Sequence, residues 1–122
     1  MNVSFNAVLI GVKDILKSKV FYENVLGVTF DEVRPPFSCF SMKGIEFMIE
    51  ENTPERGEGW AKSYVGTPKG FCFETDDIEG FLKVVTENGG SICEPITETN
   101  WNSRETKFTD IDGNIFIIEQ NL

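Results

Sequence analysis

Carboxylates are the side chains of this sequence best suited to chemistry. Glu119 ends the apolar run 114–119, and with the period of two of a strand it shares a face with Ile117. A lone carboxylate buried on that face would cost several kcal/mol. Glu119 therefore lies either at the mouth of a cavity or at the solvent-exposed end of its strand. Glu50 and Glu74 also close strand-like runs, and together the three carboxylates could hold a hard cation.

The sequence contains no histidine. This absence removes imidazole general bases, serine–histidine and cysteine–histidine nucleophile pairs, and the commonest ligand of zinc, iron, copper and nickel. Any catalysis would have to rest on carboxylates. We therefore expect no catalytic residue of these kinds and no transition-metal cofactor.

The composition describes one acidic domain. A chain of 122 residues is long enough to bury a core of its own. Its 11 basic and 20 acidic residues give a net charge of −9, which makes nucleic acid and anionic membranes poor partners and is compatible with a cationic ligand. The same charge can instead serve solubility alone.

Nothing in the sequence indicates a membrane anchor or a signal peptide. No apolar stretch reaches membrane-spanning length, and the first residues lack a basic segment followed by an apolar one. Cys39, Cys72 and Cys93 are an odd, widely spaced set within apolar runs, which indicates reduced core thiols rather than a disulfide framework or a zinc site. We expect a cytoplasmic protein.

The first part of the chain predicts a strand, a helix and three further strands. Apolar residues alternate over residues 3–12. A helix is predicted over Ile15–Leu26, with Asp14 as its N-cap and Gly27 as its C-cap. Strands are then predicted over residues 28–33, 37–42 and 45–50, separated by prolines and by a Lys-Gly turn. The order of elements is βαβββ.

The polar stretch 51–68 is rich in glycine and proline, and it is predicted to be a long connection between two halves of the chain. Trp60 and Tyr64 lie in this stretch. Aromatic side chains of a loop usually pack on the nearest core, whereas on a lid they would stack against a ligand. Both interpretations remain open.

Residues 70–90 repeat the pattern of residues 7–27. The two stretches align without a gap, which matches Asp77 with Asp14 and Gly90 with Gly27. A helix is predicted from residue 78, followed by strands over residues 91–98, 102–109 and 114–120, with an Asp-Gly hairpin turn at 112–113. The chain is thus one domain, 1–122, with a first βαβββ module (about 1–51), a linker (about 52–68) and a second module (about 69–122).

Two stretches resemble the motifs of one superfamily. Residues 8–27 resemble the opening motif D-[LI]-x-x-S-x-x-FY-x-x-x-LG of the glyoxalase/bleomycin resistance/dioxygenase superfamily, also called the vicinal oxygen chelate fold. Residues 110–114 resemble its closing motif D-P-D-G-N, with Ile111 in place of the proline. The resemblance covers nearly the whole chain. It implies an α+β fold in which two βαβββ modules form a curled, mixed-sheet cup with the helices outside, commonly as a homodimer.

The resemblance also indicates where metal-binding members place their ligands. Those positions fall on Ala7, Gly70 and Ile117 and near Met48, with Glu50 as a neighbour on the same face. Alanine, glycine and isoleucine side chains offer no ligand atoms, and carboxylates without histidine do not reproduce the chelating site. The resemblance therefore implies a bleomycin-resistance-like member that lacks the metal ligands.

Residues 100–105 resemble the W-G-x-R segment that precedes the closing hairpin in bleomycin-resistance-like members, with Asn102 in place of the glycine. The tryptophan of that segment helps to shape a binding groove, which implies the same role for Trp101. Arg104 would pair either with an anionic ligand or with a nearby carboxylate.

These observations favour a metal-free protein that binds a small molecule, with sequestration of an aromatic or cationic ligand as its mechanism. Its expected ligand-binding residues are Met48, Glu50, Trp60, Trp101, Arg104, Ile117 and Glu119. Two alternatives remain. One is a glyoxalase-type lyase, isomerase or dioxygenase with an atypical carboxylate metal site, and the other is a structural or regulatory dimer whose cup is filled by side chains.

Overall fold

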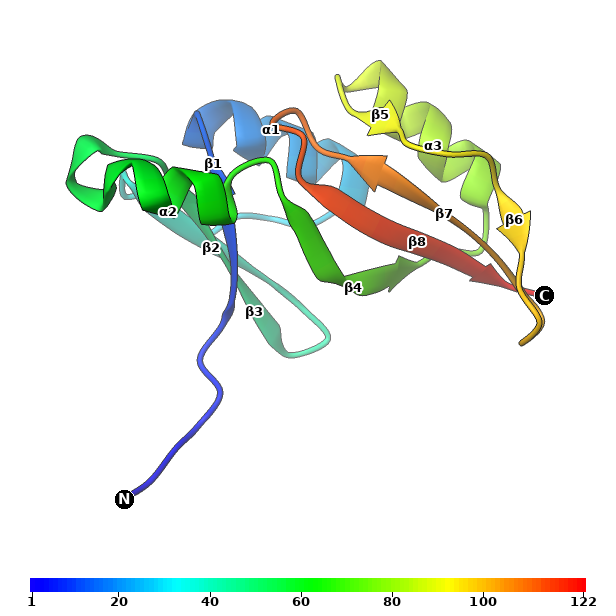
Figure 1. Ribbon diagram of the computed structural model, residues 1–122, viewed down its shortest axis with the longest axis horizontal. Coiled ribbons are helices and arrows are strands. Elements are labelled where there is room, and N and C mark those ends of the chain that lie inside the picture. The colour runs from blue at the N-terminus through cyan, green and yellow to red at the C-terminus, as the bar shows by residue number, and fades with distance from the viewer. The chain divides into compact units, whose positions relative to one another are not determined.

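The computed structural model describes all 122 residues, and the chain divides into two compact units, Met1–Val65 and Gly66–Leu122 (Figure 1). The first unit contains β1 (Val8–Val12), α1 (Ile15–Leu26), β2 (Phe37–Met42), β3 (Ile45–Glu51), the 3₁₀ helix η1 (Pro54–Arg56) and α2 (Gly57–Tyr64). The second contains β4 (Pro68–Glu74), α3 (Ile78–Glu87), β5 (Ser91–Ile92), β6 (Thr97–Glu98), β7 (Ser103–Thr109) and β8 (Ile115–Asn121). The predicted α+β class is confirmed. None of the helices combines the length and the apolar character needed to cross a membrane.

The sheet of the first unit has the order β1-β3-β2, with β1 parallel and β2 antiparallel to β3. One face of this sheet packs on α1, where Ile10, Ile49 and Phe40 are almost completely buried. Tyr22 of α1 lies against Phe40 with ring centroids 5.9 Å apart, and such an aromatic pair adds about 0.5–1.5 kcal/mol to the burial of its area. The opposite face of the sheet does not pack on α1.

Helix α1 begins and ends at the predicted residues. Oδ1 of Asp14 accepts the backbone N–H groups of Leu16 and Lys17, each at 3.1 Å, and so satisfies donors that a helix start leaves unpaired. Gly27 ends the helix with φ of 68°, a conformation that glycine adopts without strain from a Cβ atom.

Residues 28–33 do not form the predicted strand. The backbone N–H of Phe30 donates to the Glu23 carboxylate at 2.9 Å, and Oγ of Ser38 donates to the carbonyl oxygen of Asp31 at 2.9 Å. Backbone pairing with β2 is limited to isolated contacts. Side chains thus take backbone groups that a strand ladder would need, and the apolar pattern carries no sign of this competition.

Strand β1 covers Val8–Val12 rather than residues 3–12. Val8 pairs with Phe47, and β3 begins two residues before Phe47, at Ile45. Residues before position 6 therefore have no facing strand in this sheet, and Figure 1 shows them as an extended segment.

The polar stretch between the modules contains helices that the sequence analysis did not predict, η1 and α2. Gly57 and Gly59 argued against a helix there, because glycine is a poor helix former. The structure gives α2 a tertiary anchor instead, since Val65 at its end forms a bridge with Gly11 of β1. Packing has outweighed local propensity in this segment.

The sheet of the second unit has the order β4-β8-β7-β5, with β6 also paired to β7. Helix α3 packs on one face of this sheet, where Phe108, Phe116 and Ile118 are at most 1% exposed. Phe81 of α3 meets Phe108 edge to face, with centroids 5.0 Å apart. The prediction that Phe116 and Ile118 share one face of the last strand is confirmed.

The predicted hairpin at Gly113 joins β7 to β8, and Gly113 has φ of 84°. Oδ1 of Asp110 accepts the backbone N–H groups of Asp112 and Asn114 at 2.9 and 3.0 Å, and Nδ2 of Asn114 donates to Oδ2 of Asp110 at 2.8 Å. Oδ1 of Asn114 accepts the backbone N–H of Gly66 at 2.8 Å. The motif is thus a buried polar network that ties the turn to the start of the second unit.

Helix α3 starts after the predicted cap, since Oδ1 of Asp77 accepts the N–H of Gly80 at 3.0 Å. It ends at Glu87, earlier than the alignment with the first module suggested. Gly89, and not Gly90, has the left-handed backbone, with φ of 95°.

Residues 91–98 form two short strands, β5 and β6, rather than one. Pro95 lies between them and has no N–H to donate to a ladder. The carbonyl oxygen of Glu94 accepts a hydrogen bond from Oγ1 of Thr106 at 2.6 Å, so a side chain replaces a backbone partner at the break.

Candidate functional site

A pocket of about 650 Å³ opens in the first unit where β2 begins and β3 ends, beside η1. Its lining combines apolar and charged side chains: Pro35, Pro36, Phe37, Met48, Glu50, Glu51, Thr53, Glu55 and Arg56. Phe37 lies opposite Glu50 in the β2–β3 register, on the sheet face turned away from α1. Pockets that take small molecules measure about 300–1,000 Å³, so the volume suits such a ligand.

The carboxylate of Glu50 lines this pocket and is bound by one arginine. The Glu50 side chain is 5% exposed, whereas that of Arg56 is 49% exposed. Nε of Arg56 donates to Oε2 of Glu50 at 2.5 Å, and Nη2 donates to Oε1 at 2.9 Å. This two-pronged hydrogen bond is a strong form of carboxylate recognition, and it raises the pKa of Arg56. A buried carboxylate is therefore compensated by a half-exposed cation.

Helix α2 covers the sheet face that carries Glu50. Gly11 pairs with Glu50 across β1 and β3, and a Cβ atom on Gly11 would lie 2.7 Å from the backbone oxygen of Tyr64. Trp60 packs on Tyr64 with centroids 5.5 Å apart, and the guanidinium of Arg56 lies 5.5 Å from the Trp60 ring centroid, within the range of cation–π attraction. The end of α2 and the Trp60 ring thus help to position Arg56 over Glu50.

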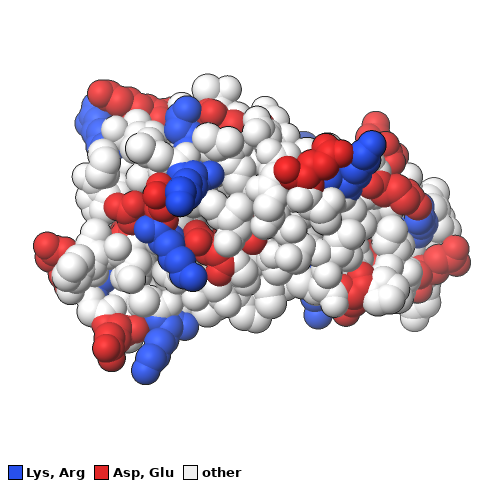
Figure 2. Space-filling model, turned by 90° about the horizontal axis from the view of Figure 1, so that it is seen from above, with Lys and Arg blue, Asp and Glu red and all other residues white.

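The pocket has an excess of negative charge. Three glutamates line it against one arginine, and the Glu50–Arg56 pair is neutral. Glu51 accepts the backbone N–H of Ile15 at 3.1 Å, and Glu55 adds a further carboxylate to the lining. On the face drawn in Figure 2, lysine and arginine side chains lie among aspartates and glutamates rather than apart from them. The acidic excess at the pocket matches the net negative charge of the whole chain, and it favours a cationic ligand group.

The structure brings together two of the predicted site residues of the first unit, because Met48 and Glu50 both line the pocket. Trp60 lies on α2 and reaches the pocket only through Arg56. The sequence predicted that Trp60 lies in a loop. In the structure it is a helical residue packed on Tyr64.

Ile117 and Glu119 lie on β8, on the face opposite α3. Glu119 pairs with Glu74 on one side and with Glu105 on the other, so three carboxylates form a row across β4, β8 and β7. Burial raises the pKa of the nearby Cys72 thiol, and the charge of Glu119 raises it further. The thiols of Cys39, Cys72 and Cys93 are free, but Cys72 and Cys93 are exposed rather than in the core.

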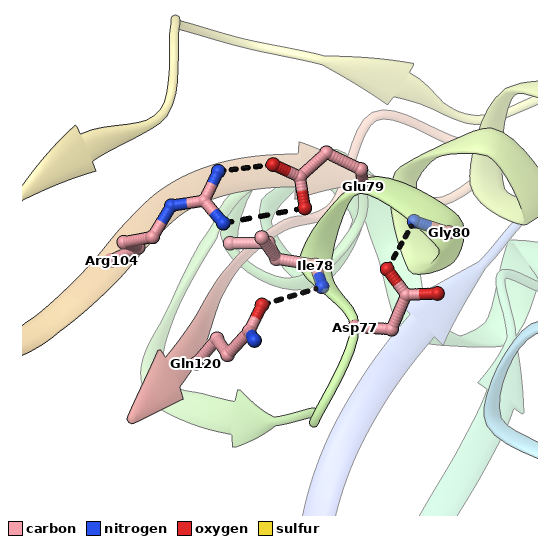
Figure 3. A network of polar contacts seen from close by, with 6 residues as sticks. All are labelled: Asp77, Ile78, Glu79, Gly80, Arg104 and Gln120. Atoms are coloured by element: carbon pink, nitrogen blue, oxygen red, sulfur yellow. Dashed lines mark hydrogen bonds and ion pairs between the residues drawn. The ribbon is translucent and has the colours of Figure 1, made fainter. Parts of the chain in front are cut away.

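Arg104 pairs with Glu79 at the start of α3 (Figure 3). Nη1 donates to Oε2 of Glu79 at 3.3 Å, and Nη2 donates to Oε1. Beside this pair, Oε1 of Gln120 accepts the backbone N–H of Ile78 at 2.9 Å. Of the two partners considered for Arg104, the structure supplies the nearby carboxylate, and the pair fastens α3 to the sheet.

Trp101 is 62% exposed in the turn before β7. It belongs to the second unit and does not line the pocket at Glu50. Its expected role in shaping a binding groove stays a prediction.

Arg56 and Phe37 are among the pocket residues that sequence reasoning missed, together with Pro35, Pro36, Glu51, Thr53 and Glu55. Arg56 lies six positions after Glu50, behind Pro54, in a stretch without helical or strand periodicity. The available signal was chemical rather than periodic, because a glutamate near the end of an apolar strand needs a cation if it is buried. Arg56 is the arginine nearest to it in the sequence.

The arrangement of the strands and helices defines a class of protein with two units of βα followed by antiparallel strands. Solved structures share it. A glyoxalase/bleomycin resistance protein/dioxygenase family enzyme from Burkholderia phytofirmans PsJN has a TM-score of 0.78 at 20% identity, over 95% of this chain and 97% of that chain. A superfamily member from Sphaerobacter thermophilus DSM 20745 has a TM-score of 0.71 at 26% identity, over 98% of both chains. Comparison with curated proteins gave no match.

A family model described as the Glyoxalase/Bleomycin resistance protein/Dioxygenase superfamily matches residues 4–118. The chain belongs to this superfamily, and the resemblance drawn from its opening and closing motifs is confirmed. A glyoxalase-related enzyme from Fulvimarina pelagi shares the fold as well, with a TM-score of 0.76 at 18% identity, over 98% of this chain and 89% of that chain.

The side chains of this chain do not fit the metal of the superfamily's metal enzymes. The expected ligand positions carry Ala7, Met48, Gly70 and Ile117, of which only the Met48 thioether has a donor atom, and it is a soft one. No group of three histidine, cysteine, aspartate or glutamate side chains is arranged to hold a metal ion. We therefore derive no chemical step through a metal.

Proposed function

We propose that this protein binds a small molecule without a metal and that the pocket at Glu50 is its binding site. The observation that carries the proposal is a buried, ion-paired carboxylate in the lining of a pocket of about 650 Å³. Buried charges are costly unless they are paired, and a core built only for stability would have been better served by an apolar residue at this position.

The lining supports an aromatic or amphipathic ligand with a cationic group. Phe37, Met48 and Pro36 offer apolar surface for a planar ligand. Glu51 and Glu55 supply negative charge on the same pocket. Sequestration follows from such a site, because stacking and charge compensation need no chemical step.

Fluorescence of Trp60 tests the proposal. In a Trp101→Phe background Trp60 is the only tryptophan, and it contacts Arg56 of the pocket. We expect aromatic cations to change its emission and to raise the melting temperature by mass action, more than neutral benzyl alcohol or anionic benzoate. Bleomycin belongs in the panel because of the superfamily's name. If no aromatic compound of any charge changes either signal, a filled, ligand-free dimer becomes the better interpretation.

A matched pair of phenylalanine variants locates the ligand. Phe37→Ala should weaken binding by ~1–3 kcal/mol, as expected for the loss of a stacking anchor in a partly desolvated pocket. Phe5 lies outside the pocket and is 72% exposed, so Phe5→Ala should leave the affinity unchanged. Equal affinities of the two variants would show that the ligand binds elsewhere and does not contact Phe37.

We also propose a cytoplasmic homodimer. Its support is the superfamily's usual assembly and the three free thiols, which suit a reducing compartment. Val3 and Phe5 are 88% and 72% exposed on the extended N-terminal segment, which leaves apolar surface for a second copy. Sedimentation equilibrium at micromolar concentration should give twice the monomer mass of 13.8 kDa, and a monomer would contradict the proposal.

A further inference from the structure

Both oxygens of the Glu50 carboxylate face a single donor group, the guanidinium of Arg56. The carboxylate is almost fully buried, yet its partner is half exposed and lines the same pocket. From the pocket, the carboxylate of Glu50 is therefore accessible only at the position that the Arg56 guanidinium occupies.

The side chain of Arg56 is more exposed than that of Glu50, and it has few contacts besides Glu50. Arg56 ends the short η1 segment, whose first residues have no side-chain cap hydrogen bond. Apart from Glu50, its guanidinium contacts the Trp60 ring, with the guanidinium carbon 5.5 Å from the ring centroid. A half-exposed arginine that leaves Glu50 regains full hydration at once, because its charge already borders solvent.

We propose that in the free protein the guanidinium of Arg56 occupies the position that the cationic group of the ligand takes when the ligand binds. The ligand class is then a planar amidinium or guanidinium that carries an apolar substituent. Its two parallel N–H groups replace Nε and Nη2 of Arg56 on the Glu50 carboxylate, and its substituent lies against Phe37 and Met48. This inference rests on the proposed binding function and adds the class of ligand and the exchange of cations.

A planar fork is favoured over an ammonium group for a geometric reason. The Glu50 oxygens accept two parallel N–H groups, at 2.5 and 2.9 Å, which an amidinium reproduces and a compact ammonium does not. Benzamidine and benzylamine differ in this feature while they share a phenyl ring and a single positive charge. We expect the protein to bind benzamidine more tightly.

Competition with Arg56 predicts the effect of its removal. In Arg56→Ala the carboxylate is free for the ligand, so the apparent affinity for benzamidine should rise by on the order of ten-fold, since an internal competitor lowers apparent affinity in proportion to its occupancy. Benzamidine should also restore part of the thermal stability that this variant loses. Arg34→Ala is the matched control, because Arg34 pairs with Glu32 at the surface.

The wild-type protein supplies a test that does not depend on the folding of a variant. The chain has three arginines, 34, 56 and 104, so their Nε–H signals can be resolved by nitrogen-15 NMR. Addition of benzamidine should move the Arg56 signal toward that of a free arginine. The Arg104 signal should stay in place, because Arg104 pairs with Glu79 and neither residue lines the pocket.

Glutamine variants test the role of each carboxylate. Glu50→Gln should abolish the preference for benzamidine over benzylamine, whereas Glu55→Gln on the same pocket should keep it while weakening both cations. Two results would contradict the exchange of Arg56 for the ligand's cation and leave the binding function intact. One is that benzamidine binds without moving the Arg56 signal, and the other is that it binds wild type and Arg56→Ala with equal affinity. Absence of binding by every aromatic compound at millimolar concentration would overturn both.

Discussion

Gly11 and Tyr64 approach each other so closely that no side chain fits between them. A Cβ atom on Gly11 would lie 2.7 Å from the backbone oxygen and 2.9 Å from the carbonyl carbon of Tyr64. Because the obstacle is backbone, a change of rotamer cannot relieve it. This contact holds the end of α2 on the sheet face that carries Glu50, and it therefore links a glycine of β1 to the pocket.

Substitution of Gly11 should separate α2 from β1. We expect Gly11→Ala to lower the free energy of unfolding by about 1–3 kcal/mol, the usual cost of overpacking, and to change Trp60 emission because α2 moves. Gly59 of α2 has open space around its Cβ position, so Gly59→Ala should stabilise the helix by about 0.5–1 kcal/mol. Urea denaturation of the two variants measures both changes in the free energy of unfolding. An unchanged free energy of unfolding in Gly11→Ala would contradict the close contact.

Removal of the Asn114 side chain should be among the most damaging changes in the second unit. Asn114 is fully buried, and Asn114→Ala leaves the N–H of Gly66 and the Asp110 carboxylate without that partner. We expect a loss of about 2–4 kcal/mol, since each buried polar group left unsatisfied costs about 1–3 kcal/mol. Asn6→Ala, at an exposed position, should cost almost nothing in the same denaturation experiment.

Glu23 should make stability depend on pH in acid. The backbone N–H of Phe30, and then Lys19, lower the pKa of Glu23 below its ordinary value of 4.5. A lowered folded-state pKa contributes stability that is present above the unfolded-state value and is lost as the pH falls through the folded-state value. The difference in melting temperature between wild type and Glu23→Gln should therefore shrink below about pH 4.5.

A second variant separates the two causes of this shift. Lys19→Met removes the ion pair but keeps the hydrogen bond from Phe30, which is the larger cause. We expect this variant to retain most of the acid-dependent difference from its own Glu23→Gln counterpart. If Lys19→Met abolishes the dependence, the hydrogen bond to Phe30 is not its main origin.

Metal content separates the binding protein from the enzyme alternative. Because the chain has no histidine and carries Ala7, Gly70 and Ile117 at expected ligand positions, elemental analysis of protein purified without chelator should find well below one metal per chain. A stoichiometric metal that is lost in Glu50→Gln or Glu119→Gln would instead support a glyoxalase-type enzyme with a carboxylate site.

The sequence by itself determined the elements whose causes are local. Asp14 and Gly27 fixed the bounds of α1, because a cap acts on backbone groups within one helical turn. Gly113 fixed the hairpin through its own positive φ, and the period of two in β8 put Phe116 and Ile118 on one face. Two motifs of this local kind also sufficed to identify the superfamily.

Only the tertiary structure decided the features that depend on groups brought together by folding. The Glu23 carboxylate and the Ser38 hydroxyl take the backbone groups of residues 28–33, and no local pattern encodes that competition. Helix α2 forms where its own glycines oppose it, because β1 offers Gly11 as a surface on which it can pack. The pocket arises in the same way, since the partner of buried Glu50 is the last residue of the 3₁₀ helix η1. The compensation of a buried charge is settled by distance in space rather than by spacing in sequence.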